Sequence, residues 1–237
     1  MSRFFLLLAA FTMISGCASL RSEVAEGVKP VMATEELESS ELLDVAIVVF
    51  DSEELTDKQI RELGLSEEIR QAEERYIPIH LKYTMQRTGQ WGSVRVVPAE
   101  SAGHVQVKGK ITHSDGERLA LDIEAFDARG IKWFEKSYSE KPRLVEYHAL
   151  AAGEKDPFQD LYNTIANDLL EHRSQLSKAD VVMIQQVSEL RIAQDMAADA
   201  FAEHLSRDEK GLYSLVRLPV DDDPMLQRVR AVQVRDE

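Results

Sequence analysis

Apolar and polar residues alternate with different periods along the chain, and the changes of period divide it into predicted elements. Residues 44–50 (DVAIVVF) form a short apolar run rich in β-branched residues, which is typical of a strand buried on both faces. A helix is expected from about Ser66, a capping residue followed by two glutamates, to Thr88. Pro78 should interrupt or restart this helix, and Gly89 should end it.

A short strand over residues 93–98 is expected to lead into an antiparallel meander of three strands. The meander comprises residues 104–112, 119–125 and 131–138. The turn at residues 114–117 joins the first two, in which alternate residues are apolar, so one face is buried and the other is in water. The predicted inner face consists of Val105, Val107, Gly109, Ile111, Leu119, Leu121, Ile123 and Ala125. Trp133 and Phe134 are adjacent in the third strand, so the pattern leaves its buried face undecided.

Beyond residue 142 the apolar residues follow the helical period. Asp156 and Pro157 predict a helix start, with Gln159 available for a capping box. Further helices are expected over residues 179–205 and 225–237. The last has no terminator, so it either frays at the surface or belongs to a chain that continues beyond residue 237. The whole pattern predicts an α+β fold, with a small mixed sheet in residues 43–142 and a mainly helical region in residues 143–237.

The first sixteen residues have the layout of an export signal, with Arg3 at the front, an apolar run and then small residues. The run from residue 4 to residue 14 is shorter than the ~20 residues that span a bilayer. Ile14-Ser15-Gly16-Cys17 resembles the lipobox of bacterial lipoproteins. The resemblance implies cleavage after Gly16 and lipid on Cys17, and Ala18 in place of aspartate implies the outer membrane. The alternative is an ordinary signal peptide, but Cys17 is the only cysteine of the chain.

Residues 17–42 are interpreted as the lipidated cysteine and a flexible acidic tether. Six glutamates and little apolar periodicity predict a segment that does not order itself. Its reach would be roughly 25–30 Å. The net charge of −14 argues against nucleic acid as a partner, because phosphates need basic side chains, and against adhesion to anionic lipid. The membrane contact is therefore expected to be the N-terminal lipid.

Two segments of the body resemble a known group of envelope proteins. Residues 45–51 (VAIVVFD) resemble the opening strand of the TolB amino-terminal domain and of curli-secretion-type (CsgG-like) lipoproteins. Residues 104–111 (HVQVKGKI) are similar to their later strand, in which a glycine precedes an isoleucine. The resemblance covers residues 44–140. It implies a non-enzymatic role in docking, assembly or secretion at the outer membrane, and it brings no catalytic residues.

The sequence contains no serine elbow, phosphate loop or His-Glu-x-x-His motif, so no cofactor or metal is expected. Asp51, Glu53 and Glu54 follow the first strand, where α/β folds often place ligands. A carboxylate pair there could cleave glycans, which makes an envelope hydrolase the alternative function. Chance proximity is the better explanation, because the chain has 42 acidic residues.

Aromatic side chains mark the predicted partner surface. Trp91 in the loop from Arg87 to Gly92, together with Trp133, could form an exposed hot spot. The leading hypothesis is therefore a lipid-anchored subunit on the periplasmic face of the outer membrane. It would bind or assemble with an envelope protein and carry out no chemistry of its own.

Overall fold

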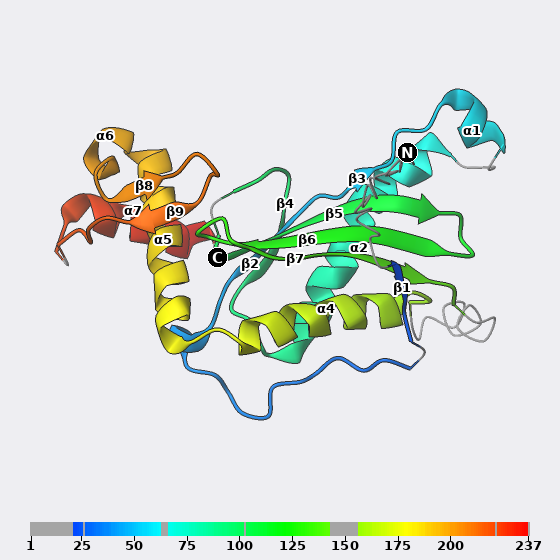
Figure 1. The fold of residues 1–237 in the computed structure, drawn as a ribbon, viewed down its shortest axis with the longest axis horizontal. Coiled ribbons are helices and arrows are strands. Elements are labelled where there is room, and N and C mark those ends of the chain that lie inside the picture. The colour runs from blue at the N-terminus through cyan, green and yellow to red at the C-terminus, as the bar shows by residue number, and fades with distance from the viewer. Residues whose placement is uncertain are drawn as a thin grey trace, which may run out of the picture.

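The computed structural model describes residues 21–25, 27–62, 66–101, 103–142, 156–220 and 222–236. It confirms the α+β class. A mixed sheet of seven strands is covered on one face by helices α2 and α4, and a smaller group of helices with a two-stranded hairpin lies beyond one end of the sheet (Figure 1). None of the described helices has the length and apolarity needed to cross a membrane. Gly16 and Cys17, the predicted site of cleavage and lipidation, lie outside the described residues.

The strand order is β1-β7-β6-β5-β2-β4, and β3 also pairs with β5. β5, β6 and β7 are antiparallel, whereas β2 is parallel to β4 and β5, and β1 is parallel to β7. The strands of this sheet are β1 (Arg21–Glu23), β2 (Val45–Val48), β3 (Asp51–Ser52), β4 (Val94–Val97), β5 (Val105–Ser114), β6 (Leu119–Asp127) and β7 (Lys132–Glu140). The hairpin consists of β8 (Leu205–Arg207) and β9 (Tyr213–Leu215).

The predicted meander is confirmed, including its inner face. Val107 lies opposite Ala125 and Ile111 opposite Leu121, and all four are buried beneath the helices. The register shifts between Ala125 and Phe126 where β6 meets β7. The adjacent Trp133 and Phe134 of β7 both reach the core: Trp133 is buried, and Phe134 is partly buried and packs against the core. The undecided face of this strand is thus resolved by a bulge, which no period in the sequence records.

The helices are α1 (Asp57–Glu62), α2 (Glu67–Thr88), α4 (Gln159–Ser174), α5 (Lys178–Met196), α6 (Ala198–Phe201) and α7 (Pro224–Asp236), with a 3₁₀ turn, η1, at Ser39–Glu41. Ser66 caps α2, and Gly89 ends it with φ of 67°. The expected interruption at Pro78 is wrong, because α2 runs through the proline. The carbonyl of Glu74, which would accept from residue 78, instead accepts from Phe50 N at 3.0 Å. This bond from the β2–β3 connection satisfies the orphaned acceptor.

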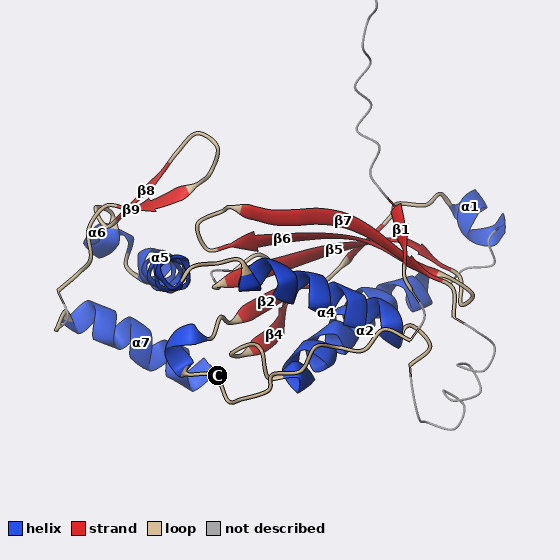
Figure 2. Cartoon of the chain, turned by 60° about the horizontal axis from the view of Figure 1, so that its bottom comes forward, coloured by secondary structure: helices blue, strands red, loops and turns tan. Residues whose placement is uncertain are grey.

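The prediction of a flexible tether over residues 17–42 is wrong for those residues of the range that the structure describes. β1 pairs with β7, and the strap, defined here as residues 24–43 without residue 26, runs along α4 toward α5 (Figure 2). Gly27 N donates to the Asp160 carboxylate at 2.6 Å, and Asn163 and Asn167 bind the backbone farther along. Composition failed here because the strap is held by polar side chains of a distant helix as well as by the apolar side chains of Val24 and Leu43 at its two ends.

The second half departs from its prediction in three places. α4 packs on β7 and α2, so the expected boundary between residues 142 and 143 does not separate two cores. Asp156 accepts from Phe158 N at 2.8 Å, but α4 begins only at Gln159, whose side chain binds Thr84 instead of completing a capping box. The helix expected over residues 179–205 ends at Met196, and Leu205 belongs to β8. The last helix is confirmed.

Candidate functional site

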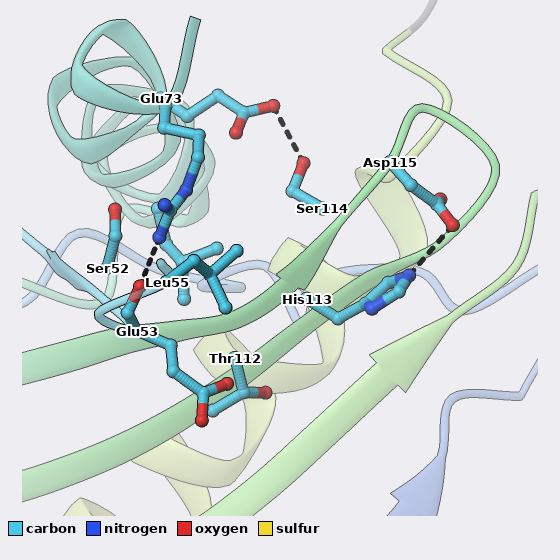
Figure 3. Close-up of a pocket in the computed structure, with 10 residues that line it drawn as sticks. Ser52, Glu53, Leu55, Glu73, Thr112, His113, Ser114 and Asp115 are labelled. Carbon is cyan, nitrogen blue, oxygen red and sulfur yellow. Dashed lines mark hydrogen bonds and ion pairs between the residues drawn. The ribbon is translucent and has the colours of Figure 1, made fainter. Parts of the chain in front are cut away.

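The hypothesis of an envelope hydrolase concerns the end of the sheet, where a small polar cavity lies between β3, β5 and α2 (Figure 3). Its volume is about 150 Å³. Glu53 N donates to Ile111 O at 3.0 Å, which holds the chain beside β5 after β3 ends. The Arg70 guanidinium donates to the carbonyl of Glu53. The Glu73 carboxylate, from the second turn of α2, accepts from Ser114 Oγ at 2.7 Å.

Asp115 closes the cavity on the side of the β5–β6 turn. Its Oδ2 lies 2.8 Å from His113 Nε2, and its Oδ1 accepts from the backbone N–H groups of Glu117 and Arg118 at 2.9 and 2.8 Å. Burial disfavours the ionised carboxylate, but the bonds from His113 and the two amides outweigh it. The pKa of Asp115 therefore lies below its ordinary value of 3.8.

This cavity is a poor fit for glycan cleavage. Ligand pockets usually enclose about 300–1,000 Å³, more than is present here. Of the three acidic residues that follow the first strand, Glu53 lines the cavity, whereas Asp51 and Glu54 are exposed on either side of Ser52 and Glu53. Glu73 is engaged by Ser114. The bonds made here join α2 to the turn between β5 and β6, which is a structural task.

A larger concavity, called here the α4–α5 groove, lies where the last turn of α4 meets the first turns of α5. Its volume is about 570 Å³. Leu170, Leu176, Val181 and Val182 form its apolar walls, and its polar lining includes Ser40, Glu41, Gln90, Arg173, Ser174 and Lys178. The size and the mixture of apolar walls with a few polar groups are typical of ligand and peptide sites. Among the described residues, no three histidine, cysteine or acidic side chains converge as a metal site would require.

Arg173 is the half-buried cation of the groove. Its guanidinium lies 5.7 Å from the centroid of the Trp91 ring, and its Nη2 donates to the carbonyl of Glu41 at 2.8 Å. Burial lowers the pKa of Arg173, and the nearby Glu41 carboxylate opposes that effect. Its Nε is buried without a hydrogen-bond partner in the described part of the chain. At the rim, Lys178 forms an ion pair with Glu41 at 3.1 Å.

The three residues predicted to bind a partner do not form one exposed cluster. Trp91 and Trp133 are each 6% exposed, so neither presents its ring to a partner. Trp133 stacks on His172 at 5.0 Å between ring centroids, and burial lowers the pKa of His172. Arg87 is exposed beside the strap. The predicted hot spot is therefore corrected: the tryptophans pack in the core because each has a side chain of α4 above it.

Sequence reasoning missed the α4–α5 groove, although a signal for it was present. Ser177 and Asp180 form a capping box, in which each side chain binds the other residue's backbone N–H. A serine followed three residues later by an acidic residue marks the start of a new helix. The capping box fixes the start of α5 after the corner that follows α4, and Arg173 lies just before that corner.

Comparisons with known proteins identify no family for this chain. No family model matches it, and no curated protein matches it. A Xanthomonas campestris protein of family DUF330 aligns with 6% identity and a TM-score of 0.41, over 65% of this chain and 97% of that one. The PelC dodecamer from Paraburkholderia phytofirmans aligns with 13% identity and a TM-score of 0.32, over 58% and 91%. A hypothetical protein from Chlamydia trachomatis aligns with 11% identity and a TM-score of 0.32, over 58% and 97%. At these TM-scores the similarities carry no inference about function.

Proposed function

We propose that this protein is a bacterial lipoprotein, anchored by lipid on Cys17 at the periplasmic face of the outer membrane, and that it acts as a non-enzymatic binding or assembly subunit. The observation that carries the proposal is the lipobox Ile14-Ser15-Gly16-Cys17 behind an apolar run of signal-peptide length. Two or more acyl chains anchor a protein stably, whereas one does so only marginally. The partner is an envelope protein.

The α4–α5 groove supports binding in preference to hydrolysis. Its volume of about 570 Å³ lies within the usual range for ligand sites. Val182 at its wall is 44% exposed, so its side chain is accessible from the groove. The guanidinium of Arg173 gives the lining of the groove a half-buried positive charge, to which a carboxylate of a partner would be attracted.

The anchoring part of the proposal is tested with Cys17→Ser in living cells. The wild-type chain should incorporate an alkyne analogue of palmitate and fractionate with the outer membrane, whereas C17S should do neither. Ala18→Asp is the matched control for sorting: it should keep the lipid but move to the inner membrane in an enterobacterial host. A C17S protein that keeps its location and its function would overturn the anchoring proposal.

The binding part is tested by crosslinking in cells, with mass spectrometry of what is captured. Val182→Arg places a charge at the groove and should remove a stoichiometric envelope partner. Ile69→Arg is the control, because Ile69 is 60% exposed on α2 and does not line the groove. Glu53→Gln tests the alternative: loss of function with the fold and the crosslinked partner intact would favour a hydrolase.

A further inference from the structure

The body of the protein begins four residues after the cysteine that is proposed to carry lipid. β1 lies parallel to β7, with Arg21 opposite Ser137 and Glu23 opposite Ser139. Val24 N then donates to Ser139 O at 2.9 Å. An extended chain spans at most about 3.3–3.6 Å per residue, so Cys17 and Arg21 are no more than about 14 Å apart.

The strap cannot increase the distance between the lipid and the body, because hydrogen bonds hold it against α4. Asn163 Nδ2 donates to the carbonyl of Val28 at 2.8 Å. Asn167 holds the next residues from both sides: its Nδ2 donates to Lys29 O and its Oδ1 accepts from Val31 N, each at 2.9 Å. The residues that might have lifted the body from the bilayer instead lie against α4.

We infer that the β1–β7 edge of the sheet is the membrane-proximal surface of the lipidated protein and that the β4 edge points away from the bilayer. The inference rests on the lipoprotein proposal. β1 and β4 are the two edges of the sheet. Five strand spacings of about 4.8 Å separate them, so the two edges lie about 24 Å apart across the sheet.

The charges along the β1–β7 edge are consistent with a surface that only the lipid holds at the membrane. A cleft of about 800 Å³ runs beside β1, and its charged lining has both signs. Glu23, Asp115 and Glu117 face Arg118 and Lys141 around it. With no excess of basic side chains, attraction to anionic headgroups contributes little. The orientation should therefore be the same on neutral and on anionic bilayers.

The inference is tested with single cysteines in the lipidated protein. Lipid consumes the thiol of Cys17, so a cysteine introduced at Glu23 on β1 or at Arg95 on β4 carries the only maleimide-reactive group. Both positions are exposed. Each variant is labelled with a fluorophore and reconstituted in phosphatidylcholine vesicles that contain headgroup-spin-labelled lipid. The label at position 23 should be quenched severalfold more than the label at position 95, with or without added phosphatidylglycerol.

A matched control lengthens the connection without touching the body. Insertion of about 20 glycine and serine residues between Ser19 and Leu20 adds an r.m.s. reach of roughly 25 Å and should abolish the difference in quenching. Equal or reversed quenching in the parent chain, with the protein still floating with the vesicles, overturns the orientation but leaves the lipoprotein proposal standing. Loss of flotation in the unmodified chain contradicts the lipoprotein proposal itself.

Discussion

The ring of Phe50 lies directly against Gly109, so closely that a Cβ at position 109 would come within 2.5 Å of the ring atom Cε1. Phe50 is 1% exposed, so its ring is surrounded by other atoms of the core, and its backbone is held by the bond from its N–H to Glu74 O. A glycine inside a strand often marks such a close approach. This contact joins the β2–β3 connection to the middle of β5.

Gly109→Ala is expected to destabilise the protein by about 1–3 kcal/mol, because an extra carbon forces a packed aromatic ring to shift. Equilibrium urea unfolding measures the change. Gly103→Ala is the control: its Cβ would meet the Cβ of Ala46 at 3.4 Å, which is ordinary van der Waals contact. Equal stability of the two variants would show that the Phe50 ring is free to yield.

Arg129→Gln should cost about 3 kcal/mol, because it leaves the carboxylate of Asp127 buried without its cation. The Asp127 side chain is fully buried, and Arg129 donates to it at 3.1 Å from Nε and 2.7 Å from Nη2. Arg217→Gln is the control, since its ion pair with Glu203 is exposed and such pairs contribute about 0–1 kcal/mol. Thermal unfolding of both variants decides the matter, and an Arg129→Gln effect as small as the control would contradict the prediction.

Asn167→Ala should loosen the strap without unfolding the body. The variant loses the amide that binds Lys29 O and Val31 N, and a lost hydrogen bond of this kind is worth about 1 kcal/mol. Hydrogen exchange at the Val31 amide should accelerate roughly five-fold. Glu171→Ala, at an exposed position of the same helix, should leave that rate unchanged. Unchanged exchange in Asn167→Ala would mean that other contacts hold the strap.

Asp115 should stabilise the fold at neutral pH and lose that effect in acid. Its folded pKa lies below the ordinary value of 3.8, so its contribution is present above that pH and declines as the pH falls toward the folded pKa. Asp115→Asn should therefore be less stable than wild type at pH 7, with a difference that shrinks below pH 3.8. Urea titrations of both proteins across this range test the sign, and a gap that widens in acid would refute it.

Local patterns predicted the elements whose energetics are local. Ser66 and Gly89 bound α2 as expected, and the alternation from Val105 to Ile111 places one face of β5 in the core. The hydrophobic period and the helix caps depend on residues that are close in sequence, so predictions based on them hold in the folded protein. The candidate site was less predictable: Trp91 and Trp133 are buried rather than exposed, because side chains of α4 cover them.

The sequence alone predicted the order of the main elements and the buried face of the first two strands of the meander, and it carries the resemblance to a lipobox. Only the tertiary structure decided that α2 continues through Pro78, that the acidic strap lies along the body and that a groove forms between α4 and α5. In the first two cases the deciding partner is distant along the chain: Phe50 N satisfies Glu74 O, and Asn167 holds Lys29. Backbone groups are satisfied by whatever donors and acceptors folding brings near, and no local pattern records those partners.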